Sequence, residues 1–275
     1  MGFINEKIIK NNLINLDHII FEVTERCNLK CKYCALSDQL YKIYNMRKSR
    51  DMPFKKAQLM IDYLINLWRE NYLCDTNIPL IVGFYGGEPL MNISLIKKII
   101  NYFEQNNIIG RQIFYSMTTN ALLLDKHIDF LAEKGFHLAI SMDGNEFAQS
   151  YRIDKFEKNS FNRVMQNVNY FKNKYPAYFN DQKVSFLSVL HNRNDVEPII
   201  DFFKNNFGKT PRISSLGVFG IREEKKEMFR EIYQNMSQSL SKSSNCEAIE
   251  EENFLEMPNS LRLAQYLYYM SENIY

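Results

Sequence analysis

The sequence contains no apolar run near the roughly 20 residues that a membrane-spanning helix needs. Its first ten residues lack the basic segment, apolar stretch and small-residue cleavage site of a secretory signal. It also lacks a charge excess, because 34 basic residues against 32 acidic ones leave a formal net charge of +2. So small a net charge produces only a weak electrostatic field, which gives no reason to expect a nucleic-acid or membrane partner. We therefore predict a cytoplasmic protein with neither partner.

Cysteine is scarce, with five residues in 275, yet three of the five fall within the eight positions from Cys27 to Cys34. In a reducing compartment, such crowding indicates metal or catalytic use rather than disulfide bonds. Cys74 and Cys246 stand alone in the sequence, so we interpret them as ordinary thiols.

What the sequence does contain is a regular alternation of short β-branched or aromatic runs with longer amphipathic stretches. This pattern predicts six strands, at His18–Thr24, Pro79–Tyr85, Gln112–Thr118, Phe136–Met142, Lys183–Val189 and Arg212–Val218. Helical material follows each strand, which is typical of βα units on a parallel sheet. We therefore predict an α/β fold, either an open sheet or a barrel, with function at the carboxyl ends of the strands.

The helices are predicted from apolar stripes and end signals. Lys55–Tyr72 is expected to bury Leu59, Tyr63, Leu64, Leu67 and Trp68, and Ile93–Phe103 to bury Leu95, Ile96, Ile99, Ile100 and Phe103. Three further helices are expected to begin at Asp125, Ser160 and Asp195, the first of them ending at Gly135. Beyond the polar segment Met228–Asn253, Ser260–Ile274 is again amphipathic.

The three clustered cysteines form a CxxxCxxC pattern directly after the first predicted strand. A loop with three thiolates can bind three irons of a 4Fe-4S cubane and leave the fourth iron open. Zinc is the competing metal, but a structural zinc site needs four ligands and no fourth Cys or His lies nearby. We therefore predict that Cys27, Cys31 and Cys34 bind an iron–sulfur cluster.

With this motif the sequence resembles the radical S-adenosylmethionine (SAM) superfamily, whose CxxxCxxC follows the first strand of a partial (β/α)6, TIM-like barrel. The resemblance implies that SAM binds the open iron and is split by one electron to give a 5′-deoxyadenosyl radical. Tyr33 stands where the family often has an aromatic residue close to the adenine. Shielding of the cluster from water is an equally good explanation of this tyrosine.

The second strand ends in Gly86-Gly87-Glu88, which matches the GGE motif that holds the SAM amino group in the family. The glycines let the backbone come close to a ligand. The resemblance further implies SAM contacts for Asn120, Ser141 and Arg152, which lie after the third and fourth strands. Ala121 replaces the glycine that relatives have after the asparagine, and Ala148-Gln149 replaces a His-Asp pair before the arginine. We assign no catalytic residue, and interpret His191 as structural, with a substrate-facing role as the alternative.

The pattern from Phe21 to about Val218 is most similar to peptide maturases of the SPASM type and to anaerobic sulfatase-maturating enzymes. The resemblance implies a precursor peptide or protein as substrate and an electron donor such as flavodoxin or ferredoxin. The function expected from the resemblance is radical modification of a ribosomal peptide, and the alternatives are a sulfatase-maturase-like protein-modifying enzyme or a noncatalytic iron–sulfur or zinc protein. We expect residues 1–17 to be an N-terminal extension, 18–240 the radical SAM core, and 241–275 a linker with the start of a C-terminal region. The sequence is expected to be either a truncated form of such an enzyme or a shorter enzyme that needs one cluster.

Overall fold

A computed structural model describes residues 5–36, 40–41, 48–70, 79–106 and 111–243. Its centre is a sheet of six parallel strands in sequence order, which confirms the predicted α/β fold class. The strands are β1 (His18–Thr24), β2 (Leu80–Gly86), β3 (Ile113–Thr119), β4 (His137–Ser141), β5 (Val184–Leu190) and β6 (Arg212–Ser215). Among the described residues β6 does not pair with β1, so the barrel is partial.

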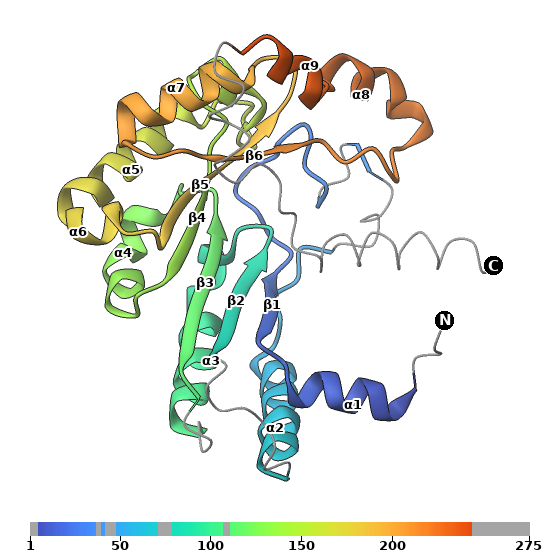
Figure 1. Cartoon of the computed structure of the whole chain (residues 1–275), viewed down its shortest axis with the longest axis vertical. Helices are drawn as coiled ribbons and strands as arrows, with labels where there is room; N and C mark the ends of the chain where they lie inside the picture. Colours follow the sequence, from blue (N-terminus) through green and yellow to red (C-terminus); the bar gives the residue numbers. More distant parts are fainter. Residues whose placement is uncertain (1–4, 37–39, 42–47, 71–78, 107–110, 244–275) are drawn as a thin grey trace.

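The main crossover helices cover one face of this sheet, and none of them lies on the other face (Figure 1). The main crossover helices are α2 (Phe54–Glu70), α3 (Ile93–Asn106), α4 (Leu124–Glu133), α5 (Phe161–Lys174) and α7 (Val196–Phe207). The shorter elements are α1 (Glu6–Ile14), η1 (Pro89–Asn92), η2 (Ala148–Tyr151), α6 (Pro176–Asn180), η3 (Glu223–Lys225), α8 (Lys226–Ile232) and α9 (Met236–Ser241). All carboxyl ends of the parallel strands therefore meet at one edge of the sheet.

The core lies between the sheet and the covering helices. The stripe predicted for α3 is confirmed, since all five of its apolar residues are buried. The stripe predicted for α2 is partly wrong, because Leu59 and Tyr63 are exposed. The buried face of α2 instead follows helical spacing through Ala57, Ile61, Leu64, Ile65, Leu67 and Trp68. Leu59 and Tyr63 each lie two residues from a buried position, about 200° round the helix, and so point away from the sheet.

Most predicted boundaries agree with the structure to within a few residues. Ser160 and Asp195 occupy the N-cap positions of α5 and α7, as predicted. Asp125 is not an N-cap, because α4 begins one residue earlier and places Asp125 in its first turn. Gly135 follows the end of α4 with φ +61°, a left-handed conformation that favours glycine. The last strand is shorter than predicted and ends at Ser215 rather than Val218.

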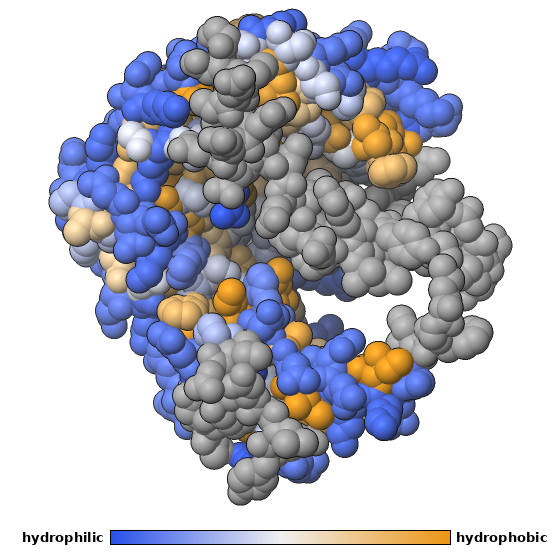
Figure 2. All heavy atoms as spheres, in the orientation of Figure 1, coloured by the Kyte–Doolittle hydropathy of each residue, from blue (hydrophilic) through white to orange (hydrophobic). Residues whose placement is uncertain are grey.

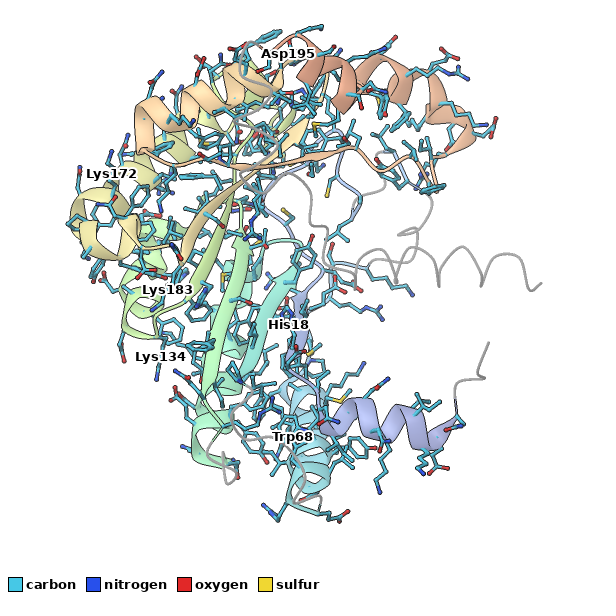
Figure 3. All side chains as sticks on the ribbon, viewed as in Figure 1. His18, Trp68, Lys134, Lys172, Lys183 and Asp195 are labelled. Carbon is cyan, nitrogen blue, oxygen red and sulfur yellow. The ribbon has the colours of Figure 1, made fainter. Side chains whose placement is uncertain are left out.

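The N-terminal residues form a helix, α1, that lies beside the amino end of β1 (Figure 1). The indole nitrogen of Trp68 on α2 donates a hydrogen bond of 2.9 Å to the carbonyl oxygen of Leu13 and so attaches α1 to the core (Figure 3). Ile8 and Ile9 remain exposed on α1, where Figure 2 shows hydrophobic side chains at the surface. Residues 1–17 thus include a docked helix, which the sequence did not predict.

The sheet face away from the helices carries alternate side chains of each strand. On β1 and β2 this face is open enough to leave Ile20 60% and Tyr85 44% exposed. No helix in the described part of the chain is both long and apolar enough to cross a membrane. The helix predicted over Ser260–Ile274, together with the linker from residue 244 onward, lies outside the described residues.

Candidate iron–sulfur site

The cysteine loop leaves the carboxyl end of β1 and is anchored on both sides. On one side it pairs with the segment after η2, through hydrogen bonds from the amide nitrogens of Lys30 to Ile153 oxygen (2.7 Å) and of Lys32 to Tyr151 oxygen (3.0 Å). On the other side the Arg26 guanidinium forms a two-point ion pair with Asp51, at 2.9 and 2.7 Å. The loop is therefore held in place by the protein itself.

The three thiols lie close enough for a negative charge on one to raise the pKa of another. Burial raises the pKa of Cys27 to about 11 and that of Cys31 to about 12, so without metal these groups stay protonated near neutral pH. Iron provides the positive charge that compensates thiolates in such surroundings, and its binding releases the protons. The donor set and its polarity therefore fit a cluster.

A cluster and a single ion require different spacings of the three thiols. Three sulfurs on one zinc at 2.3 Å each would lie about 4 Å apart, whereas each iron of a cubane takes its own thiolate. In the described part of the chain, no three His, Cys, Asp or Glu side chains converge tightly enough to hold a single metal ion.

The glycine pair at the end of β2 touches the backbone of the cysteine loop. The amide nitrogen of Gly87 donates to Thr24 oxygen (2.9 Å) and that of Glu88 to Arg26 oxygen (2.8 Å). A Cβ atom on Gly86 would lie 2.2 Å from Thr24 oxygen, and one on Gly87 would lie 2.2 Å from Arg26 oxygen. No side chain fits at such distances, so both glycines are required for the loop to pack against β2.

Glu88 is buried, and its carboxylate connects the end of β2 to the end of β3. It accepts hydrogen bonds from Leu90 nitrogen (3.2 Å), the Thr119 hydroxyl (2.7 Å) and Asn120 nitrogen (2.7 Å). Burial raises the pKa of Glu88 to about 7, although these hydrogen bonds act in the opposite direction. The carboxylate thus fixes the position of the Asn120 backbone.

Asn120 in turn reaches the cysteine loop. Its side-chain nitrogen lies 3.7 Å from Cys27 Sγ and 2.8 Å from the Asn28 side-chain oxygen, to which it donates. The next residue, Ala121, has φ +61°. This left-handed conformation disfavours any residue with a Cβ by roughly 1–2 kcal/mol, which explains why a glycine would suit the position. Ser141 lies at the end of β4 and is half-buried.

Tyr33 and Arg152 meet at a buried aspartate, Asp143, that follows β4. The Arg152 guanidinium forms two hydrogen bonds of 2.9 Å with the Asp143 carboxylate. The Tyr33 hydroxyl donates to the same carboxylate, and the Arg152 guanidinium lies 5.5 Å from the centre of the Tyr33 ring. Burial alone would raise the pKa of Asp143, but the Arg152 charge and the hydrogen bonds outweigh it and hold that pKa well below its usual range.

His191, from the loop after β5, completes this cluster of buried polar groups. Its Nε2 atom lies 3.6 Å from Asp143, and its ring centre lies 5.6 Å from that of Tyr33. The side chain is fully buried, which agrees with a structural histidine. Sequence reasoning missed Asp143 as a functional candidate. Its position directly after a strand end, nine residues before Arg152, was the available signal.

The sequence profile of the radical SAM superfamily matches residues 21–204, more than half of the chain. The protein therefore belongs to the radical SAM superfamily. Members of this superfamily use a 4Fe-4S cluster and SAM, and here Cys27, Cys31 and Cys34 are the residues that would hold the cluster.

Three known proteins are similar to this chain in sequence or in fold. An uncharacterized protein of Methanocaldococcus jannaschii is 37% identical over 144 residues, 51% of this chain and 44% of that protein. A cysteine-type anaerobic sulfatase-maturating enzyme of Clostridium novyi is 29% identical over 195 residues, 69% of this chain and 48% of that enzyme. A structure of native anSMEcpe with bound AdoMet (SAM) and a peptide shares the fold, with a TM-score of 0.59, 22% identity, and coverage of 73% of this chain and 51% of the other.

These comparisons confirm the predicted partial barrel and the predicted family. The chain spans about half the length of the relatives it matches.

Proposed function

We propose that this protein reductively cleaves SAM at a 4Fe-4S cluster and uses the resulting 5′-deoxyadenosyl radical to modify a ribosomal peptide. The observation that carries this proposal is the contact between the cysteine loop and the Gly86-Gly87 turn of β2. The packing of the loop against the turn already requires the two glycines, and the same close approach puts the backbone of the turn beside the cysteines, where it supports a role in binding the SAM amino group.

The residues around the cluster loop have separate roles in this proposal. The Glu88 oxygens already accept hydrogen bonds from the protein, so we assign the SAM amino group to the backbone of Gly86 and Gly87. Asn120 and Ser141 lie at neighbouring strand ends and offer polar groups to the ribose or the carboxylate of SAM. Tyr33 and Arg152 are held by Asp143 beside the loop, where Arg152 supplies positive charge for the SAM carboxylate.

The substrate is proposed from the relatives. One relative is a sulfatase-maturating enzyme, and the structure of anSMEcpe contains a peptide. The same relatives favour a second candidate function, the maturation of a sulfatase-like protein. In either case the cluster needs one electron from outside, for which we propose flavodoxin or ferredoxin. We retain residues 18–240 as the catalytic core, with 1–17 as an extension and 241–275 as a linker and the start of a C-terminal region.

Product analysis with two peptides tests this proposal. The anaerobically reconstituted protein is supplied with SAM, a chemical reductant and either a synthetic cysteine-containing sulfatase-type peptide or a precursor peptide encoded beside its gene. We expect SAM cleavage together with a change in the mass of one peptide, and the modified peptide decides between the two candidates. SAM cleavage without any change in either peptide would contradict the proposed substrate class.

A further inference from the structure

The outer face of the cysteine loop carries two lysines that alternate with buried residues. Leu29, Cys31 and Tyr33 point into the protein, whereas Lys30 and Lys32 between them are exposed. The alternation places the two lysine side chains on the solvent side of the loop, which turns at Lys32 and Tyr33 through the hydrogen bond from Cys34 nitrogen to Cys31 oxygen (3.1 Å). The exposed lysines are thus one residue away, along the chain, from the buried cluster ligand Cys31.

Two further lysines extend this surface. The loop pairs in antiparallel fashion with the segment after η2, through the bridge between Leu29 and Asp154, and that segment continues into Lys155 and Lys158. Both side chains are exposed. We call Lys30, Lys32, Lys155 and Lys158 the lysine face. Within the described residues, none of the four ammonium groups forms an ion pair with a carboxylate.

The lysine face also has an apolar centre and a net positive charge. Phe156, between the last two lysines, is 68% exposed. Segments 27–34 and 153–159 contain the four lysines against Asp154 and Glu157, so their net charge is +2, the same as that of the whole 275-residue chain. The Asp154 carboxylate accepts hydrogen bonds from the backbone of Phe156 and Lys158, so part of this negative charge is used within the loop.

We propose that the lysine face docks an acidic one-electron donor protein of the flavodoxin or ferredoxin class. This inference rests on the proposed function, which requires an electron from outside. In the described part of the chain, the cluster cysteines are the only thiols, so no second iron–sulfur centre is present there to relay the electron. One electron leaves the reduced donor and reduces the cluster, and no covalent bond forms or breaks in that transfer.

The position of the lysine face favours an electron donor over a peptide. SAM and the substrate need the inner side of the cysteine loop, where Cys31 is buried, whereas Lys30 and Lys32 lie on its solvent side. Electron transfer between proteins slows steeply with distance, so a donor gains most by docking against the loop that carries the cysteines. Electron-transfer complexes are small and weak, and like-signed charge around an aromatic residue suits such an interface because it steers an oppositely charged partner.

Charge reversal tests the inference. The variant Lys30→Glu/Lys32→Glu is compared with Lys7→Glu/Lys10→Glu, a control with the same change in charge on exposed positions of α1. Helix α1 lies at the amino end of β1, opposite to the cysteine loop (Figure 1). The rate of cluster reduction by a reduced acidic flavodoxin is followed by stopped-flow absorbance at low and high salt. Reduced methyl viologen, a small cation, serves as the reference reductant.

At low salt we expect the loop variant to be reduced by flavodoxin at least about tenfold more slowly than the parent, with a weaker salt dependence. The control should match the parent with flavodoxin, and methyl viologen, being a cation, should reduce the loop variant no more slowly than the parent. Equal flavodoxin rates for the parent and the loop variant would overturn the inference. So would an equal slowing with methyl viologen, because the reversal would then act on the cluster itself.

Two further arms separate the remaining explanations. A labelled acidic peptide whose binding is lost in the loop variant, with flavodoxin reduction unchanged, would make the lysine face a peptide site and refute donor docking. SAM cleavage driven by methyl viologen in the parent tests the proposed function independently. If that cleavage is absent, the proposed function fails. If that cleavage is present and flavodoxin reduces the parent and the loop variant at the same rate, only the docking inference fails.

Discussion

Replacing Asp143 by asparagine removes the charge at the centre of the buried cluster around Arg152. The Asp143 side chain is fully buried and the Arg152 side chain is 9% exposed. Asparagine preserves the shape of the side chain but leaves the guanidinium without a counter-charge. The loss of one partner from a buried ion pair typically costs about 3–5 kcal/mol. We expect Asp143→Asn to lower the free energy of unfolding at pH 7 by that amount.

At acid pH the difference in the free energy of unfolding between the parent and Asp143→Asn should become smaller. The pKa of Asp143 in the folded protein lies below its ordinary value of 3.8, so the ion pair stabilises the fold above about pH 4. As the pH falls below that value, the parent progressively loses the stabilisation that the variant already lacks. Parent and Asp143→Asn should therefore converge in acid.

The assay is denaturant unfolding of the parent, Asp143→Asn, Arg152→Met and the double variant, followed by circular dichroism. Since the double variant leaves no buried unpaired charge, we expect it to be no less stable than Asp143→Asn, with a coupling energy of about 0.5–3 kcal/mol. Arg163→Gln is the control, because it breaks a partly exposed pair with Asp125 and should cost about 0–1 kcal/mol. Strictly additive losses for Asp143 and Arg152 would refute this reasoning.

Four further changes have defined outcomes. Gly87→Ala places a methyl group against Arg26 oxygen, so it should lower the free energy of unfolding by about 1–3 kcal/mol and reduce the iron content. Gly217→Ala is the control and should change neither quantity, because the Tyr41 hydroxyl, at 4.0 Å, is the nearest atom among the described residues to the added methyl group. Asn120→Ala removes a donor near Cys27 Sγ, so a redox titration should give a more negative cluster potential; an unchanged potential contradicts this. Trp68→Phe removes the hydrogen bond to Leu13 and should lower the free energy of unfolding by about 1 kcal/mol. Equal unfolding midpoints for parent and variant would show that this bond does not stabilise the attachment of α1. Burial raises the pKa of Glu88 to about 7, so the free energy of unfolding of the parent should fall as the pH rises from about 4.5 to about 7. Glu88→Gln should lose this pH dependence. If the variant retains it, another group causes it.

The strands could be predicted because alternating βα units leave a clear hydrophobic pattern. The α2 stripe was predicted correctly at Leu64, Leu67 and Trp68 but not at Leu59 and Tyr63. These two residues are apolar like their buried neighbours, so only the packing shows that they face away from the sheet. The docking of α1 depends on Trp68, more than 50 residues away in sequence. Long-range contacts of this kind leave no local signal.

The cysteines and glycines of the site could be singled out from the sequence because their chemistry depends on residue type and spacing, and their roles in binding the cluster and SAM stay predictions. The role of Asp143 was not, since it arises from contacts with Tyr33, Arg152 and His191 on different loops. The structure also gives Gly86 and Gly87 a packing role that the motif alone does not reveal. The SAM contacts of Asn120, Ser141 and Arg152 stay predictions.

The most direct test of the account is the release of 5′-deoxyadenosine by protein whose iron and sulfide content has first been measured as four of each. With SAM and dithionite under anaerobic conditions, we expect the parent to release 5′-deoxyadenosine and Cys31→Ala to release none. A full cluster without any 5′-deoxyadenosine, or equal release from Cys31→Ala, would contradict the assignment of this loop as the site of SAM cleavage.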